Sequence, residues 1–161
     1  FFVRAFSQEV MHKQKPRVLE KEWLDAFFRL RAETGKCPYC KNEMFYTAEG
    51  VNECFECKKQ IQKPAILMCK HYQLPIYNGM KVYLWHIDST LEDIETIAGE
   101  IVGNPQNPQV LGLRNTSTYT WIVNLPDGTQ KPLAPGSVVP VKDGFGIDFF
   151  GNNQSTATMK I

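Results

Sequence analysis

Four of the five cysteines in this chain form two closely spaced pairs, Cys37 with Cys40 and Cys54 with Cys57. Each pair follows the pattern Cys-x-x-Cys, and 13 residues separate one pair from the other. A gap of two residues lets the chain turn so that both sulfur atoms point to one centre. Two such turns complete a tetrahedron of thiolates, a geometry that suits Zn²⁺. The spacing therefore predicts a metal site with these four cysteines as its ligands.

The sequence around the cysteines is typical of a zinc ribbon. The interval between the pairs has the length of a hairpin and contains Thr47, Glu49 and Gly50. Four lysines flank the ligands and offset part of the negative charge of a tetrathiolate site: Lys36, Lys41, Lys58 and Lys59. Because four protein ligands leave no open position for water or substrate, we expect the zinc to be structural and not catalytic.

Three other uses of the cysteines remain open at this stage. Two disulfides require an oxidising compartment, and no signal for secretion is present. A thioredoxin-like dithiol uses a single Cys-x-x-Cys at the start of a helix. Iron of the rubredoxin type has the same four ligands as zinc. The fifth cysteine, Cys69, stands alone in a predicted strand, and we interpret it as a small buried apolar residue.

Composition indicates a globular chain without a strong charge. Of its 161 residues, 43% are hydrophobic, and the formal net charge is +1. A charge this small gives no support to nucleic-acid or membrane-surface binding. The longest apolar runs are far shorter than the roughly 20 residues of a membrane span. The chain begins with Phe1-Phe2 and carries no secretory leader. We therefore interpret it as a cytoplasmic fragment of a longer protein.

The chain divides into three segments, 1–34, 35–63 and 64–161. The first is helical: Leu19, Trp23, Phe27 and Leu30 recur at helical spacing, which predicts an amphipathic helix over about 15–34 whose apolar stripe packs against the next domain. A shorter helix is predicted from Val3 to Met11. The second segment is the zinc ribbon.

The third segment has the pattern of an antiparallel β-sandwich. Short runs of Val, Ile, Tyr, Phe and Thr alternate with turn signals that contain Gly79, Gly128, Gly136 and Gly144. Asn-Gly and Asp-Gly supply the positive φ angles that tight turns require. The capping-box pattern at 89–92 predicts either a short helix through Ile97 or a loop.

Residue patterns typical of catalysis are missing from this sequence. His12, His71 and His86 are scattered, and none has the spacing of a metal ligand or a general base. No phosphate-binding glycine loop, nucleophile elbow or catalytic carboxylate pair occurs. We therefore expect no enzymatic activity from these residues.

Residues 2 to 30 resemble the last part of a protein kinase C-lobe. In that family a Phe-rich helix is followed by a loop, an Arg-Pro-Thr/Ser element and a helix with Glu-Trp. The corresponding residues here are Lys15-Pro16-Arg17 and Glu22-Trp23, with Lys15 in the place of the family's arginine. Followed by a Cys₄ ribbon and a β domain, this tail resembles bacterial serine/threonine kinases of the tellurite-resistance phosphorylation triads. Those kinases accompany a metal-dependent protein phosphatase and a von Willebrand A-domain protein.

The β region is similar in pattern to a forkhead-associated (FHA) sandwich. Residues 101–104, Ile-Val-Gly-Asn, stand where that family opens with Ile-Gly-Arg, and residues 133–138 and 146–149 resemble its closing strands. FHA domains read phosphothreonine through that arginine and a Ser-Arg-x-His element, for which this chain has Asn104 and the run from Asn115 to Thr118. The resemblance implies a partner or phosphopeptide surface at these residues: Asn104, Arg114, Asn115, Thr116 and Ser117.

Together these features predict a non-catalytic docking module of a bacterial Ser/Thr kinase that binds the von Willebrand A-domain protein, and also the phosphatase. Five aromatic residues suit this docking surface if they are exposed and are equally candidates for the core: Tyr72, Tyr77, Tyr83, Trp85 and Tyr119. A phosphothreonine reader of FHA type is the first alternative. A nucleic-acid-binding ribbon is the second, based on nearby lysines: Lys41, Lys58, Lys59, Lys63 and Lys70.

Overall fold

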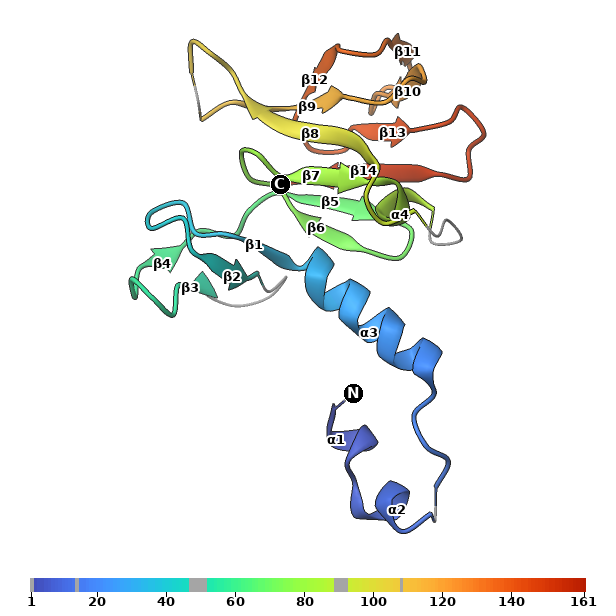
Figure 1. The fold of residues 1–161 in the computed structure, drawn as a ribbon. Helices are drawn as coiled ribbons and strands as arrows, with labels where there is room; N and C mark the ends of the chain where they lie inside the picture. Colours follow the sequence, from blue (N-terminus) through green and yellow to red (C-terminus); the bar gives the residue numbers. More distant parts are fainter. Residues whose placement is uncertain (1, 14, 47–51, 89–92, 108) are drawn as a thin grey trace.

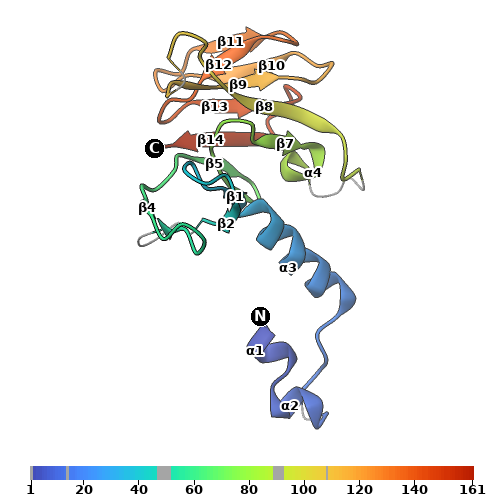
Figure 2. The same ribbon diagram turned by 60° about the vertical axis from the view of Figure 1, so that its left-hand side comes forward.

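The computed structural model describes residues 2–13, 15–46, 52–88, 93–107 and 109–161. Figure 1 shows short N-terminal helices that extend away from a β-rich body, and Figure 2 shows the same separation after rotation. This arrangement confirms the expectation of a mainly β chain with helices at its N-terminal end. None of the helices in these ranges combines the length and hydrophobicity needed to cross a membrane.

Three helices open the chain: α1 (Phe2–Ala5), α2 (Gln8–Met11) and α3 (Glu20–Ala32). The predicted single helix from Val3 to Met11 is wrong because it is interrupted at Ser7. The backbone of Ser7 is extended, and its Oγ accepts a hydrogen bond from the N–H of Val10 at 3.4 Å. A serine hydroxyl favours this position because it satisfies an amide that has no partner in the first turn of a helix.

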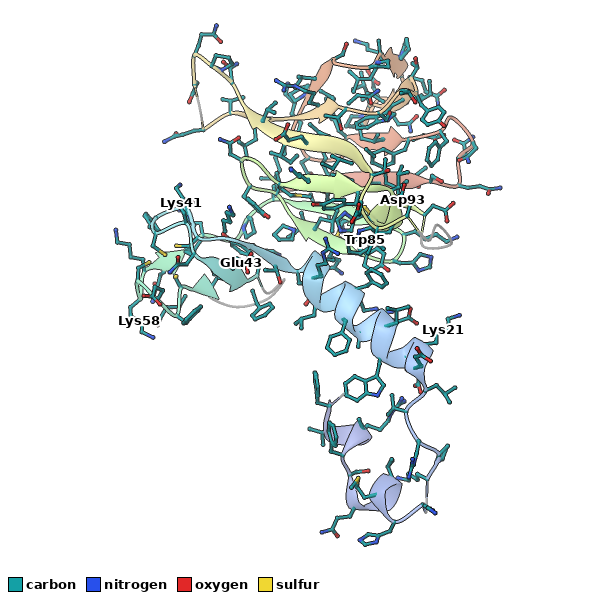
Figure 3. The ribbon with its side chains drawn as sticks, viewed as in Figure 1. Lys21, Lys41, Glu43, Lys58, Trp85 and Asp93 are labelled. Atoms are coloured by element: carbon teal, nitrogen blue, oxygen red, sulfur yellow. The ribbon has the colours of Figure 1, made fainter. Side chains whose placement is uncertain are left out.

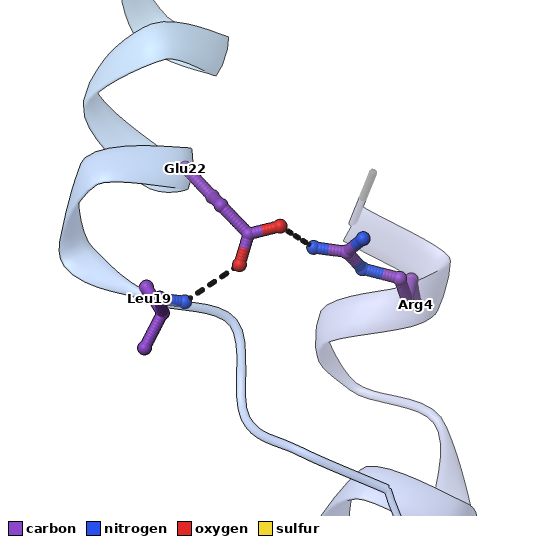
Figure 4. Close-up of polar contacts among 3 residues, drawn as sticks. All are labelled: Arg4, Leu19 and Glu22. Carbon is purple, nitrogen blue, oxygen red and sulfur yellow. Dashed lines mark hydrogen bonds and ion pairs between the residues drawn. The ribbon is translucent and has the colours of Figure 1, made fainter.

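Helix α3 begins later than predicted because its first turn is capped by Glu22. The N–H of Leu19, which has an extended backbone, donates to the Glu22 carboxylate at 2.9 Å. The same carboxylate forms an ion pair with Arg4 of α1 (Figure 4). These two contacts hold the pKa of Glu22 below its usual range. The start of α3 is thereby joined to α1.

The apolar stripe of α3 does not pack against the β-rich body. The ring of Trp23 instead lies 5.3 Å from that of Phe2 and 6.0 Å from that of Phe6, measured between centroids. Phe27 and Leu30 remain 51% and 42% exposed. The expectation that this stripe is covered by the next domain is therefore wrong for the described residues.

A different face of α3 makes the contact with the body. The ring of Phe28 lies 4.8 Å from that of Trp85, and Ala32 is buried in the main core. These two positions are four residues apart, so they share one side of the helix. Sequence periodicity located the stripe but not the face that is buried.

Two antiparallel sheets form the β domain, which spans residues 66–160. The larger sheet has the strand order β11-β10-β13-β14-β5-β6, and the smaller has the order β12-β9-β8-β7. The strands of the larger sheet are β5 (Ile66–Cys69), β6 (Gln73–Pro75), β10 (Trp121–Asn124), β11 (Gln130–Leu133), β13 (Gly146–Asp148) and β14 (Thr156–Lys160). Those of the smaller sheet are β7 (Lys81–Tyr83), β8 (Ile97–Gly103), β9 (Leu111–Asn115) and β12 (Val138–Pro140).

The two sheets share one hydrophobic core. Leu67 and Met159 of the larger sheet and Ile101 and Leu113 of the smaller sheet are completely buried in it. Strand β14 alternates exposed and buried residues, as expected for a strand with one face on a core. A short helix that the sequence analysis did not predict, α4 (Leu84–Ile87), adds further side chains to this core.

The four turn glycines all adopt positive φ angles between 74° and 83°. Of these four glycines, only Gly128 lies in a turn between two strands that pair with each other, β10 and β11. The turns at Gly79, Gly136 and Gly144 carry the chain from one sheet to the other. The turn positions were therefore predictable from glycine chemistry, whereas the strand pairing around them was not.

The sequence analysis predicted either a helix through Ile97 or a loop, and the structure of residues 93–97 bears on this choice. Residues 89–92, which carry the capping-box pattern, lie outside the described ranges. Asp93 accepts hydrogen bonds from the N–H groups of Glu95 and Thr96 at 3.0 and 2.9 Å. Ile97 is the first residue of β8, so no helix extends through it.

Asn115 is completely buried in β9 and holds a polar network together. Its Nδ2 donates to the carbonyls of Tyr119 and Leu133 at 2.7 and 3.0 Å. Its Oδ1 accepts from the backbone N–H and the hydroxyl of Ser117 at 3.0 and 2.7 Å. The expectation that Asn115 belongs to an exposed partner surface is wrong, because every polar atom of its side chain is used inside the domain.

We predict that Asn115→Ala lowers the free energy of unfolding by about 3 kcal/mol, because it removes the donor to the buried Leu133 carbonyl and the acceptor of the Ser117 N–H and hydroxyl. Urea unfolding measures this change. Thr118→Ala alters an exposed residue of the same turn and should change stability by less than about 0.5 kcal/mol. Equal unfolding midpoints for the two variants would contradict the structural role assigned to Asn115.

Candidate metal centre

Two short hairpin-like sheets hold the cysteine pairs. Strands β1 (Thr34–Lys36) and β2 (Glu43–Phe45) enclose the first pair, and β3 (Asn52–Glu53) and β4 (Gln60–Ile61) enclose the second. We call residues 34–61 the metal module, of which residues 34–46 and 52–61 are described. Its two halves use the same local fold, one for each cysteine pair.

Matching backbone hydrogen bonds close the two turns. The N–H of Cys37 donates to the carbonyl of Asn42 at 2.8 Å, and that of Lys41 donates to Cys37 at 3.0 Å. In the second turn, the N–H of Cys54 donates to the carbonyl of Lys59 at 3.0 Å, and the N–H of Lys58 donates to the carbonyl of Cys54 at 2.8 Å. The equivalence explains why the same Cys-x-x-Cys spacing occurs twice.

Each turn ends on a lysine with left-handed backbone geometry, Lys41 at φ 67° and Lys58 at φ 58° (labelled in Figure 3). A residue with a Cβ atom adopts this region at a cost of about 1 to 2 kcal/mol. Both turns therefore keep a conformation that the chain alone disfavours, which indicates that interactions at the cysteines maintain it.

The four sulfur atoms converge on one point. The Sγ atoms of Cys37 and Cys57 are 3.8 Å apart, and those of Cys40 and Cys54 are 3.6 Å apart. All four lie within 4.8 Å of one another. A regular tetrahedron with Zn–S bonds of about 2.3 Å has an edge of about 3.8 Å. The cluster thus has the size of a tetrathiolate metal site.

A small core surrounds the cluster. Cys37 and Cys54 are completely buried, and they pack with Met44, Tyr46 and Ile61. Burial raises the pKa of Tyr46 to about 12, so its hydroxyl remains protonated, and it donates to the carbonyl of Lys36 at 2.8 Å. These contacts position the cysteine ligands from the side opposite the solvent.

The thiols influence one another's ionisation. Burial opposes ionisation of Cys37, but backbone N–H groups of Cys40 and Tyr39 lower the pKa of Cys37 to about 6. For Cys40, an N–H of Asn42 favours the thiolate, yet burial and the other three cysteines raise its pKa to about 12. Ionisation of one thiol in the cluster therefore opposes ionisation of the next. A divalent cation at the centre removes this conflict because it binds all four as thiolates.

The positions of the sulfur atoms also test the other uses considered for the cysteines, namely disulfides, a redox dithiol and iron binding. All five cysteines are free thiols, and sulfur separations of 3.6 and 3.8 Å are far longer than a disulfide bond of about 2.05 Å. A single redox dithiol does not account for two matched pairs. The donor set fits zinc and iron alike, since both take four thiolates.

Cys69 lies apart from the cluster, at the end of β5. It is buried, and burial raises the pKa of its thiol to about 12. The interpretation of Cys69 as a small buried residue is therefore confirmed.

Two of the residues proposed for a partner surface come together on the smaller sheet. Asn104 and Arg114 line an open groove of about 350 Å³ together with Val110 and Val138. Thr116 is exposed and Ser117 half-buried beside the buried Asn115. A partner surface at Asn104, Arg114, Thr116 and Ser117 stays a prediction, whereas Asn115 has a structural role.

The aromatic residues expected at the docking surface are distributed differently. Tyr119 is 57% exposed, whereas Tyr72 and Trp85 are buried at 8% and 2% exposure. Tyr77 and Tyr83 are half-buried. Tyr72 and Trp85 therefore follow the core alternative, because both belong to the main core.

Sequence analysis missed a cluster at the junction of α3, the metal module and α4. There Arg31 lies over the rings of Tyr83 and Trp85, at 5.4 and 5.6 Å from their centroids. His86 lies beside Trp85, with 3.8 Å between ring centroids. More than 50 residues separate Arg31 from the other three, and no spacing rule in the sequence connects them.

Comparison of the chain with protein-family models, with curated proteins and with solved structures finds no match. Within the described ranges, Cys37, Cys40, Cys54 and Cys57 form a group that could hold a metal ion.

We predict that Cys54→Ser abolishes stoichiometric metal binding, because a hydroxyl is a poor ligand and the remaining thiols no longer form a tetrahedron. Elemental analysis of the purified protein measures the metal and identifies it. Cys69→Ser is the matched control and should retain the full metal content. Chelation of the wild-type protein should lower its melting temperature. Equal metal content in the two variants would refute the site.

Proposed function

We propose that this chain is a non-catalytic regulatory and docking module in which a structural zinc ion fixes a helical segment relative to a β domain. The observation that carries this proposal is the cluster of four sulfur atoms within 4.8 Å of one another. With four protein ligands the ion has no position for a substrate, so its contribution is to folding. The metal module follows directly after α3 and leads into β5, where it controls the junction.

The contact between the metal module and the β domain supports this role. Gly35 of β1 is buried, and a Cβ atom added there would lie 2.7 Å from the ring of Tyr46 and 2.8 Å from that of Tyr77. Tyr46 belongs to the metal module and Tyr77 to the β domain. Only a glycine permits both rings to approach the strand this closely.

The exposed apolar side chains of the helical segment support a position against a further protein surface. Val3, Phe6 and Leu24 are 87%, 66% and 54% exposed. In this proposal, residues 1–34 are the end of a protein kinase C-lobe, as their resemblance implies, and the parent protein is a bacterial Ser/Thr kinase. Apolar patches of this kind mark protein interfaces.

The groove on the smaller sheet is the proposed docking surface of an FHA-like β domain. It combines exposed apolar residues with one arginine: Val102, Pro105, Val110, Val138, Pro140 and Arg114. Arginine surrounded by apolar surface is typical of an interface hot spot. The partner we propose is the von Willebrand A-domain protein that accompanies such kinases, and the metal-dependent phosphatase is a further partner.

A phosphothreonine reader is a second candidate, favoured by the exposed Arg114, which lines the same groove as Asn104. Calorimetry with phosphothreonine peptides separates the two functions, because a reader binds the phosphorylated peptide and loses this binding in Arg114→Ala. A docking surface that does not read phosphate binds its partner without phosphorylation.

Nucleic-acid binding by the metal module is a third candidate. Tyr39 and Phe55, one from each cysteine turn, are 55% and 65% exposed, and exposed aromatic rings can stack on bases. The ammonium of Lys59 lies 4.6 Å from the Tyr39 ring centroid and partly occupies that face. Binding of an oligonucleotide that weakens steeply with salt would favour this function.

We predict that Gly35→Ala lowers the free energy of unfolding by about 1 to 3 kcal/mol, because its methyl group displaces two packed tyrosine rings. Urea unfolding of the metal-loaded protein measures the change. Phe45→Ala removes an exposed ring from the same hairpin and is the control, with a much smaller effect. A fully tolerated Gly35→Ala would contradict the fixed junction.

For docking, we predict that the chain co-elutes with the von Willebrand A-domain protein at micromolar concentration in size-exclusion chromatography. Val138→Asp places a charge in the groove, and Arg114→Ala removes its cation, so each should weaken the complex at least about tenfold. Lys131→Ala, on β11 of the other sheet, is the control. Absence of a complex with wild-type protein would reject this partner.

A further inference from the structure

A second concave site lies where three parts of the chain meet. This junction pocket has a volume of about 330 Å³ and is bordered by the end of α3, by the β1–β2 hairpin and by β6, β7 and α4. Figure 3 labels Glu43, which borders it from β2, and Trp85, which borders it from α4. Its size lies within the range of small-molecule sites.

The charged groups of the junction pocket are mainly cationic. Arg31, Lys36 and Lys81 line it, against one carboxylate, that of Glu43. The ion pairs found in the described ranges, Arg4 with Glu22 and Lys15 with Glu9, involve none of these four residues. The pocket therefore carries an excess of two positive charges from three different segments.

The uncharged polar groups of the pocket are also donors. The Nδ1 of His86 accepts the N–H of Tyr83 at 3.1 Å, which leaves the ring proton on Nε2. Burial, and then the charge of Arg31, lower the pKa of His86 to about 3, so the ring is neutral. The indole N–H of Trp85 also has no acceptor among the described residues, but it is enclosed behind the pocket wall and does not reach the pocket surface. A group rich in acceptors complements such a wall.

We propose that the junction pocket binds a small molecule that carries a phosphate group, held by Arg31, Lys36 and Lys81. A phosphate dianion matches the excess of two positive charges and forms charge-assisted hydrogen bonds with guanidinium and ammonium groups. The half-buried rings of Tyr77 and Tyr83 provide an apolar wall for the rest of the ligand. This site is separate from the groove at Arg114 and does not depend on protein docking.

The position of Lys36 connects this site to the metal centre. Lys36 directly precedes the ligand Cys37, and its carbonyl accepts the hydroxyl of Tyr46. Metal removal loosens this strand, so it should weaken phosphate binding. The ligand would in turn stabilise the junction, because it binds three segments that are joined only in the folded state.

Calorimetry on the metal-loaded chain at low salt tests the proposal with three probes: inorganic phosphate, AMP and succinate. We expect a phosphate-bearing probe to bind, and Lys36→Gln and Lys81→Gln each to weaken it about tenfold. Lys21→Gln is the charge-matched control on the exposed side of α3 (Figure 3) and should leave the affinity unchanged.

Each outcome has a defined meaning. Binding of inorganic phosphate and AMP with equal affinity identifies phosphate itself as the ligand, whereas binding of AMP alone identifies a phosphate ester. Succinate binding as tightly as phosphate would overturn the assignment of ligand class. No heat with either phosphate probe at millimolar concentration, or equal losses in Lys81→Gln and Lys21→Gln, would overturn the site. The metal content of the same samples separates this result from a failure of the zinc proposal.

Discussion

The convergence of four cysteine sulfur atoms within 4.8 Å is the constraint on which the junction of this molecule depends. The sulfur atoms of Cys40 and Cys54 approach to 3.6 Å, and their neighbours raise the pKa of Cys40 to about 12. Four clustered thiolates are stable only around a cation, and binding of that cation contributes to the free energy of folding. Lys41 and Lys58, which directly follow Cys40 and Cys57, adopt left-handed backbone geometry beside the same cluster. Our proposal of a structural zinc ion accounts for both features.

The metal module lies between helix α3 and the β domain and contacts the β domain. Ala32 at the end of α3 is part of the main core, and Gly35 in the next strand lies between tyrosine rings of the module and of the β domain. Lys36 of the module lines the junction pocket together with Arg31 and Lys81, and these three residues give the pocket its positive charge. Loss of the metal would therefore affect the pocket as well as the cysteines, although no residue of the pocket is a ligand.

Local sequence chemistry predicted the parts of the structure that depend on neighbouring residues. The cysteine pairs converged as their spacing required, and the glycines of the four turns adopted positive φ angles. Predictions failed where partners come from distant segments. The α3 stripe around Trp23 met α1 instead of the β domain, and Asn115 turned inward to bond with Leu133. Neither outcome could be derived from periodicity, because it depends on which surfaces meet.

The sequence by itself determined the two cysteine pairs that form the cluster, the predominance of β structure and the places where the chain turns, since each follows from contacts within a few residues. Tertiary structure alone decided that three of the four turns cross between sheets, that Trp85 is buried, and that Arg31, Lys36 and Lys81 border one pocket. These cations lie between 5 and 50 positions apart along the chain. Only packing of α3 and the metal module against the β domain brings their charges together, and no pattern within one segment encodes that packing.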